Sequence, residues 1–281
     1  MCQAVRIRAR REHIVDLDQD DLRAGVIDTS RPHPARIYDY LLGGENHYAA
    51  DRLAGEELLA AAPEARAGVR ANRAFMERAV RYAVGAGVRQ VLDIGTGLPT
   101  SPNVHEIAES VAPGVRVAYV DNDPIVKAHG DALLSRTGST GIVLGDVREP
   151  RSVLGHPEVR RLIDFDEPVV LLLVAVLHFL TDDDEPARVV AELRDALPAG
   201  SHLVLSHATG DFADRGEAEA GYSRKASASL NLRSKDRVES FFEGFELVEP
   251  GLAQISYWRP DSPPPAEAAK IGFYGGVARL P

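Results

Sequence analysis

The sequence predicts an α/β fold in which helices cover both faces of one mostly parallel β-sheet. Short aliphatic segments alternate with helical patterns between residues 90 and 206, and this alternation indicates repeated strand–helix–strand units. The segment VVLLLVAV at Val169–Val176 is aliphatic throughout, as expected for a central strand buried on both faces. We therefore expect right-handed crossovers and parallel strands that end along one common edge of the sheet.

The predicted elements follow this alternation in order. Aliphatic segments predict the strands, and apolar residues at helical spacing predict the helices between them. A helix at 236–242 then precedes two segments that are expected to pair as an antiparallel hairpin at the sheet edge. The expected strands are 90–94, 115–120, 141–144, 169–176, 202–206, 245–248 and 272–280, and the connecting helices are 103–111, 124–135, 151–162 and 185–197.

A helical segment, 26–88, is predicted to precede the sheet region, 89–281, within one structural domain. Thr29 or Ser30 is a suitable cap for its first helix, with Pro32 and Pro34 in the first turn. Helices at 47–62 and 64–83 follow. Residues 1–25 are dominated by charged side chains and predict a poorly ordered leader with at most one marginal helix.

The first helix ends in a stretch that has two interpretations. Gly43 and Gly44 stop a helix that carries Tyr38, and Asn46 follows them. The stretch is either the end of a surface helix packed on the domain or a lid that places these residues over a ligand. Arg73, in a later helix, is likewise either a solvated charge or a contact to a ligand.

Composition excludes several classes of function. The 281 residues carry a formal net charge of −10, which argues against nucleic-acid or anionic-membrane binding as the main activity. The single cysteine, Cys2, excludes an internal disulfide and a cysteine-based zinc site. No apolar run reaches the length of a membrane span, and the N-terminus has no hydrophobic export segment, so we expect a cytoplasmic protein.

A glycine turn follows the first predicted strand and indicates a ligand site. In QVLDIGTGLPTSP, the strand runs into Gly95-Thr96-Gly97, where a ligand can lie against backbone N–H groups. Asp121 ends the next strand, 24 positions after Gly97, close to the spacing of a ribose-binding carboxylate. The third glycine of a dinucleotide motif is missing, so the turn suits a nucleoside better than a dinucleotide and disfavours an NAD-dependent oxidoreductase.

Acidic residues at neighbouring strand ends extend this site. Asp121 is suited to accept hydrogen bonds from both ribose hydroxyls. Asp146 is suited to the amino group of adenine, with the N–H of Val147 meeting a ring nitrogen. This arrangement needs neither a metal nor a phosphate. The alternative is that both aspartates are ordinary loop or cap residues.

Together these motifs resemble a bacterial family of class I S-adenosylmethionine-dependent methyltransferases, formerly catalogued as a domain of unknown function. The resemblance covers the chain from Ile27 to its C-terminus and is carried by RIYDYLLGGENHYAADR, ANRAFMERAVR, VLDIGTGLPTSPNVHE, YVDNDPIV, GDVREP, AVLHFL and LSHATGDF. It implies a Rossmann-like sheet of seven strands with the seventh antiparallel, a helical N-terminal lid and bound S-adenosylmethionine. It does not imply a particular methyl acceptor.

The resemblance also implies a role for each matched residue. Gly95, Thr96 and Gly97 would face the methionine part of the cofactor, and Asp93 would orient their turn. Asp121 and Asn122 would bind the ribose and the adenine edge, and Asp146 and Val147 the adenine. Ala175 and Val176 would line the floor beneath the sulfonium. The lid interpretation of Tyr38, Gly43, Gly44 and Asn46 gains support, and Arg73 joins the predicted cofactor-binding residues.

The catalytic residue is less well defined by the sequence. His178 follows the fourth parallel strand, where it is either a general base or a packing residue. His207, Asp211, Tyr222 and Arg233 are weaker candidates on the acceptor side. We predict a methyltransferase that acts on a small-molecule acceptor and releases S-adenosylhomocysteine. The alternative is a non-catalytic protein that senses S-adenosylmethionine or its product. The sequence lacks the N/D-P-P-Y/F motif of enzymes that methylate a flipped base, and it does not predict the oligomeric state.

Overall fold

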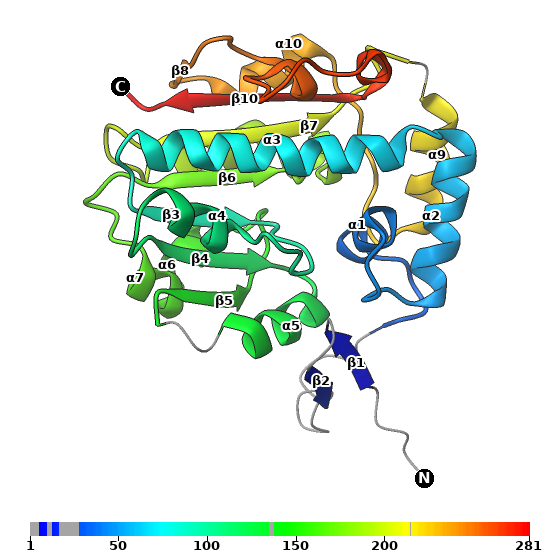
Figure 1. Cartoon of the computed structure of the whole chain (residues 1–281), viewed down its shortest axis with the longest axis horizontal. Helices are drawn as coiled ribbons and strands as arrows, with labels where there is room; N and C mark the ends of the chain where they lie inside the picture. The colour runs from blue at the N-terminus through cyan, green and yellow to red at the C-terminus, as the bar shows by residue number, and fades with distance from the viewer. Residues whose placement is uncertain (1–5, 10–12, 17–27, 135–137, 214) are drawn as a thin grey trace.

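One mixed β-sheet organises the computed structural model, which describes residues 6–9, 13–16, 28–134, 138–213 and 215–281. Five strands run parallel, and the last two pairings across the sheet are antiparallel, so that only the strand next to the parallel five runs against them in the main strand order (Figure 1). The predicted fold class is therefore confirmed. The order across the sheet is β5 (Thr140–Leu144), β4 (Arg116–Asp121), β3 (Gln90–Ile94), β6 (Val170–Val174), β7 (His202–Ala208), β10 (Phe273–Arg279) and β8 (Glu246–Leu247).

The sheet has eight strands rather than the predicted seven. The additional strand, β9 (Ala253–Gln254), pairs with β10 at Tyr274 and Gly275, whereas β8 pairs with β10 at Ala278 and Arg279. The predicted hairpin partner of β10 is therefore divided into two short pieces. Each piece is only two residues long, which is too short for the alternation of apolar and polar residues to reveal it.

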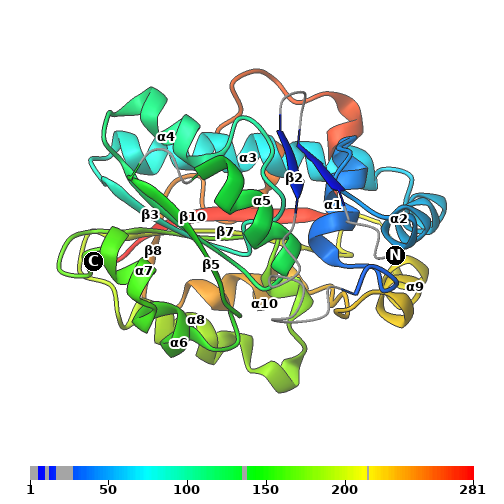
Figure 2. The same ribbon diagram turned by 90° about the horizontal axis from the view of Figure 1, so that it is seen from below.

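Helices cover both faces of the sheet, as Figure 2 shows. Adjacent strand residues point to opposite faces, so Val91 packs in one apolar core and Leu92 in the other. One face is covered by α3 (Ala65–Gly85), α4 (Val104–Val111) and α5 (Pro124–Leu134), and the other by α6 (Pro150–Gly155), α7 (Pro157–Leu162), α8 (Pro186–Arg194) and α10 (Lys235–Glu239).

The helix predicted at 151–162 is two helices. His156 has an extended backbone, and its ring accepts a hydrogen bond from the N–H of Glu158. Pro157 then occupies the first position of α7, where the N–H that proline lacks is not needed. The break between the two helices therefore lies at Pro157. The helical spacing of apolar residues continues across this proline, so the spacing alone does not reveal the break.

Four helices gather beyond the carboxyl ends of the parallel strands. They are α1 (Pro34–Leu42), α2 (Ala49–Ala61), the beginning of α3, and α9 (Gly216–Lys225), which the sequence analysis did not predict (Figure 1). Ile37, Leu41, Val69 and Tyr222 form a separate apolar cluster between them. The N-terminal helices thus lie over the edge of the sheet where a ligand site is expected.

The cap of α1 differs from the prediction. His33, not Thr29 or Ser30, occupies the cap position, and its ring accepts from the N–H of Ala35. Pro34 takes the first helical position, while Gly43 ends the helix with φ 86°, as predicted.

The leader also differs from the prediction where it is described. Arg6–Ala9 (β1) and His13–Asp16 (β2) pair as antiparallel strands, not as a marginal helix. The predicted disorder concerns residues that lie outside the described part of the chain. None of the helices in the described part combines the length and apolar character that a membrane span requires.

Candidate active site

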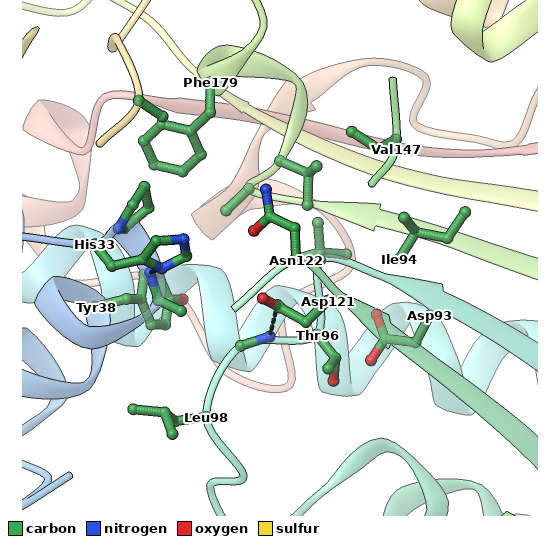
Figure 3. Close-up of a pocket in the computed structure, with 18 of the residues that line it drawn as sticks. His33, Tyr38, Asp93, Ile94, Thr96, Leu98, Asp121, Asn122, Val147 and Phe179 are labelled. Atoms are coloured by element: carbon green, nitrogen blue, oxygen red, sulfur yellow. Dashed lines mark hydrogen bonds between the residues drawn. The ribbon is translucent and has the colours of Figure 1, made fainter. Parts of the chain in front are cut away.

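The predicted glycine turn lies at the carboxyl end of β3. Gly95 and Gly97 have φ values of 75° and 68°, a region that side chains disfavour. A Cβ on Gly95 would lie 2.3 Å from a methyl carbon of Val176, so the turn passes too close to the neighbouring strand end for any other residue. The Asp121 carboxylate accepts a hydrogen bond of 2.8 Å from the N–H of Gly97 and thereby ties the turn to β4 (Figure 3).

A cavity of about 470 Å³ opens in front of this turn. Figure 3 shows His33 and Tyr38 approaching it from the side of α1, with Asp93, Thr96 and Asp121 on the opposite wall. Most of the predicted cofactor residues line it, namely Tyr38, Arg73, Asp93, Gly95, Thr96, Gly97, Asp121, Asn122, Asp146, Val147, Ala175 and Val176.

The wall of the cavity is acidic. Burial raises the pKa of Asp93 to about 7, even though a hydrogen bond with Thr96 and the charge of Arg73 favour its ionised form. Burial also raises the pKa of Asp121, although its carboxylate accepts hydrogen bonds from the N–H groups of Asp123 and Gly97, which favour the ionised form. Both carboxylates are therefore held in a partly desolvated state that a nearby positive charge would relieve.

Asp146 is in a different state. Burial opposes its ionisation, but hydrogen bonds from Arg148 outweigh burial and hold its pKa below the usual value. The guanidinium contacts both carboxylate oxygens, at 2.9 and 2.5 Å. Asn122 adds a further hydrogen bond, and the neighbouring Val147 is buried in the core below.

A chain of hydrogen bonds connects the floor of the cavity to α1. Ala175, with φ 58°, leaves β6 and donates to the hydroxyl of Ser206 at 3.0 Å. Ser206 donates to the amide oxygen of Asn72 at 2.6 Å, and the Asn72 amide donates to the hydroxyl of Tyr38 at 3.0 Å. Tyr38 in turn donates to the carbonyl of Val69. Tyr38 is thus held by two residues of α3, one of which, Asn72, connects it to the strand ends.

Arg73 lines the cavity but uses its guanidinium within the protein. One of its nitrogens donates to the carbonyls of Thr100 and Pro102, at 2.8 and 2.7 Å. It therefore holds the loop that follows the glycine turn, and a direct contact with a ligand stays a prediction.

Gly43, Gly44 and Asn46 do not line the cavity. Gly44 and Asn46 contact the side chain of Asp39 instead, and Asn46 N–H donates to its carboxylate at 2.9 Å, whereas Gly43 ends α1. A Cβ on Gly44 would lie 2.0 Å from the same carboxylate, so a side chain has no room there. Asp39 itself lines the cavity, and the geometry gives Gly44 and Asn46 a role in positioning it. The predicted contact of Gly43, Gly44 and Asn46 with the cofactor is not supported.

The geometry does not support the predicted role of His178 as a general base. His178 is buried away from the large cavity, and its Nδ1 accepts from the N–H of Ala208 at 3.2 Å. The proton of the neutral ring is therefore on Nε2, which leaves no free lone pair. Burial lowers the pKa of His178 well below its ordinary value, and the charge of Arg233 acts in the same direction.

The weaker candidates have structural roles. Arg233 donates to the carbonyls of Leu177 and Leu180 and to His207, fixing the turn after β6. Burial lowers the pKa of His207 to about 3. Asp211 accepts from Lys235 N–H and from the hydroxyl of Tyr274.

Several cavity residues were missed by the sequence analysis. They include the cap residue His33, the aromatic ring of Phe179, and residues in the loops after β6 and α9. A single residue in a connecting loop carries no periodicity and no motif, so only the cap position of His33 offered a local signal. The missed residues include His33, Asp39, Phe179, Thr181, Asp184, Ser227 and Ser229.

The chain is similar to known methyltransferases. A family model described as S-adenosyl methyltransferase matches residues 20–281. A DUF574 family protein from Streptomyces avermitilis MA-4680 is 45% identical, with 91% of this chain and 100% of that chain covered and a TM-score of 0.87. A proposed methyltransferase from Thermobifida fusca YX is 38% identical, with 90% and 97% covered and a TM-score of 0.86. The search of curated proteins found no match.

A more distant structure shares the fold alone. The plantazolicin methyltransferase BamL, crystallised with S-adenosylhomocysteine, is 10% identical, with 88% of this chain and 96% of that chain covered and a TM-score of 0.50.

The sheet order and the cavity at the strand ends are those of a class I S-adenosylmethionine-dependent methyltransferase. The chain belongs to the S-adenosyl methyltransferase family, whose model matches nearly its full length. The resemblance of its motifs is therefore confirmed, and S-adenosylmethionine is its cofactor.

Proposed function

We propose that the large cavity binds S-adenosylmethionine and that the enzyme transfers the methyl group to a small molecule. The observation that carries this proposal is the acidic character of the cavity around the glycine turn. Among the described residues, five aspartates and two arginines line it, and Arg73 and Arg148 both have partners within the protein. Such a wall favours a ligand with a sulfonium and an ammonium group over one with a pyrophosphate.

The residues fit the parts of this cofactor. A volume of about 470 Å³ is within the range of small-molecule sites. A Cβ on Gly97 would meet nothing within 4 Å, so the space in front of the turn is open for the methionine part. The Asp121 carboxylate can still accept hydrogen bonds from the ribose hydroxyls. Asn122, Asp146 and Val147 line the adjoining part of the cavity, where the adenine attached to this ribose would lie.

The bound cofactor supplies a methyl group whose carbon–sulfur electron pair returns to sulfur as the lone pair of the acceptor bonds to the carbon, so no acid is needed for the leaving group. The protein therefore has to position the acceptor about 3 Å from the methyl carbon and exclude water. Tyr38 would help to position the acceptor, and hydrogen bonds with Asn72 and the carbonyl of Val69 hold its hydroxyl in place. Residues 26–88 serve as the lid of the core 89–281.

We also propose a cytoplasmic enzyme with no nucleic-acid substrate. The single cysteine suits a reducing compartment, and a net charge of −10 disfavours binding to a polyanion.

Calorimetric titration with S-adenosylmethionine, S-adenosylhomocysteine and NAD tests the proposed site. We expect the first two to bind at one site per chain and NAD not to bind. NAD binding in place of the other two would contradict the assignment of the cavity. Binding of both sulfur ligands without methylation of any molecule in a broad small-molecule panel would favour the non-catalytic alternative.

A further inference from the structure

A second, smaller cavity of about 100 Å³ lies beside the cofactor cavity. The two cavities share a wall formed by Pro34, Tyr38 and Phe179. Helices α1, α2, α3 and α9 enclose the small cavity, together with the turn after β6 and the beginning of β10. It is therefore placed between the lid and the strand ends, directly behind the residues that would face the transferred methyl group.

The small cavity is lined almost entirely by apolar groups. Its side chains include Ile37, Leu41, Val69, Leu230 and Phe273.

Several polar groups at this surface have partners, whereas Nε of Arg215 is buried without a hydrogen-bond partner. Glu64 forms an ion pair with Arg215, and the hydroxyl of Tyr38 donates to the Val69 carbonyl. His178 is uncharged and accepts from Ala208. A charged or strongly hydrated group would lose its water here and gain few partners in return, so the cavity favours a neutral apolar group.

One side chain of the shared wall is held without a hydrogen bond. Tyr38 is held by hydrogen bonds to Val69 and Asn72, and Pro34 is fixed at the start of α1. Phe179 is held by apolar and ring contacts: it packs against the cluster of Ile37 and Leu41, its ring stacks on Tyr222 at 5.9 Å, and it lies 4.3 Å from the ring of His178. Rotation of Phe179 about its side-chain bonds would connect the two cavities without breaking a hydrogen bond.

A glycine in α3 keeps the small cavity open. Gly68 makes its helical hydrogen bond to the Glu64 carbonyl, and a Cβ there would meet only the Phe273 ring, at an ordinary 3.6 Å. Alanine would therefore fit, and it would stabilise the helix by about 0.5–1 kcal/mol. The fold does not need glycine at this position, whereas an open cavity does.

We propose that the small cavity binds the apolar end of the methyl acceptor, a neutral ring or branched alkyl group, and that Phe179 is the gate between this group and the cofactor. The proposal rests on the placement of S-adenosylmethionine in the large cavity. An apolar cavity of about 150 Å³ accommodates benzene. The small cavity has about 100 Å³, so it can hold one small ring when movement of Phe179 adds the remaining space.

The test uses the full-length protein saturated with S-adenosylhomocysteine and two probes, phenol as a neutral ring and glycerol as a polar molecule of similar size. Saturation-transfer NMR measures the binding of each. Two variants reduce the cavity: Gly68→Ala adds one methyl group, and Ala218→Leu adds a larger group from α9. Ala220→Leu is the matched control, because it makes the same change on the exposed side of the same helix.

We expect phenol but not glycerol to bind, and the dissociation constant of phenol to rise at least fivefold in Gly68→Ala and Ala218→Leu but not in Ala220→Leu. Phenol binding that is absent, or equal in all variants, would overturn the proposal. The affinity of each variant for S-adenosylmethionine is measured separately. Failure of the wild type to bind the cofactor contradicts the proposed function. Normal cofactor affinity, together with phenol binding that is absent or equal in all variants, contradicts only this inference.

Discussion

The two cavities of this enzyme are built from different parts of the fold. The large cavity is formed mainly by loops at the carboxyl ends of parallel strands, and its wall carries the aspartates. The small cavity is formed mainly by helices, and its wall is apolar. Strand ends present backbone N–H groups and short polar side chains, whereas packed helices present their apolar faces. The difference suits a charged cofactor in one place and an apolar acceptor group in the other.

Both α1 and α3 contribute several residues to each cavity, so loosening α1 should disturb both. Arg36 of α1 is buried and lies 3.2 Å from the Asp123 carboxylate and 3.6 Å from that of Asp51. Replacing Arg36 with methionine leaves two buried carboxylates without their cation, which we expect to lower the free energy of unfolding by about 3–5 kcal/mol. Urea denaturation measures the loss.

Arg70→Met is the control, because Arg70 is exposed on α3. We expect it to change stability by less than about 0.5 kcal/mol. A similar small change in the Arg36 variant would show that the ion pairs do not hold α1 in place.

The second prediction separates the two cavities at Asp121. Asp121→Ala should weaken S-adenosylmethionine binding by about 1.5–3 kcal/mol, roughly ten- to a hundredfold, because hydrogen bonds to a charged group are lost. Calorimetry measures the affinity, with Asp131→Ala on the exposed side of α5 as the control. Unchanged affinity in a folded Asp121 variant would contradict the assignment of the ribose site.

The third prediction concerns pH and the large cavity alone. Because burial raises the pKa of Asp93 to about 7, this carboxyl is increasingly protonated as the pH falls below 7. A cationic ligand binds better to the ionised form, so its affinity should rise with pH through 7, by up to about tenfold per pH unit below the pKa.

Asp93→Asn provides the comparison for this pH dependence. The ionisable groups of the cofactor itself respond to pH in the same way in both experiments. The difference in pH dependence between the two proteins therefore reports on Asp93 alone. Calorimetry measures the affinity of each protein between pH 5.5 and 8.5. The same pH dependence in both would show that the charge of Asp93 does not affect ligand binding.

The smallest predicted effect concerns the small cavity alone. Gly68→Ala should raise the free energy of unfolding by about 0.5–1 kcal/mol and leave S-adenosylmethionine affinity unchanged. Thermal denaturation followed by circular dichroism detects the gain. A lower melting temperature would show that Gly68 is required by the fold and would remove the argument that it keeps the cavity open.

The sequence predicts the polar cavity well because its signals are local. The strand predicted at 90–94 is β3 itself, and the glycine turn with Asp121 lies where the motif places it. The end of β6 is less well predicted. VVLLLVAV remains aliphatic through Val176, but the strand ends at Val174 because Ala175 adopts φ 58°.

The apolar cavity could not be predicted in this way. Its wall brings Ile37 together with Tyr222 and Phe273, which are far apart in the chain. No single segment carries its signal, and α9 has little apolar periodicity of its own. His178 shows the same limitation, because its place after a strand suggested a base, whereas its hydrogen bond to Ala208 depends on how β7 packs beside it.

A crystal structure of the protein with bound S-adenosylhomocysteine would show how the cofactor lies in the large cavity. We expect the ribose hydroxyls on the Asp121 carboxylate, the methionine part against Gly95–Gly97, and the sulfur facing the wall formed by Tyr38 and Phe179. A ligand whose ribose lies away from Asp121, or whose sulfur faces away from that wall, would contradict this expectation.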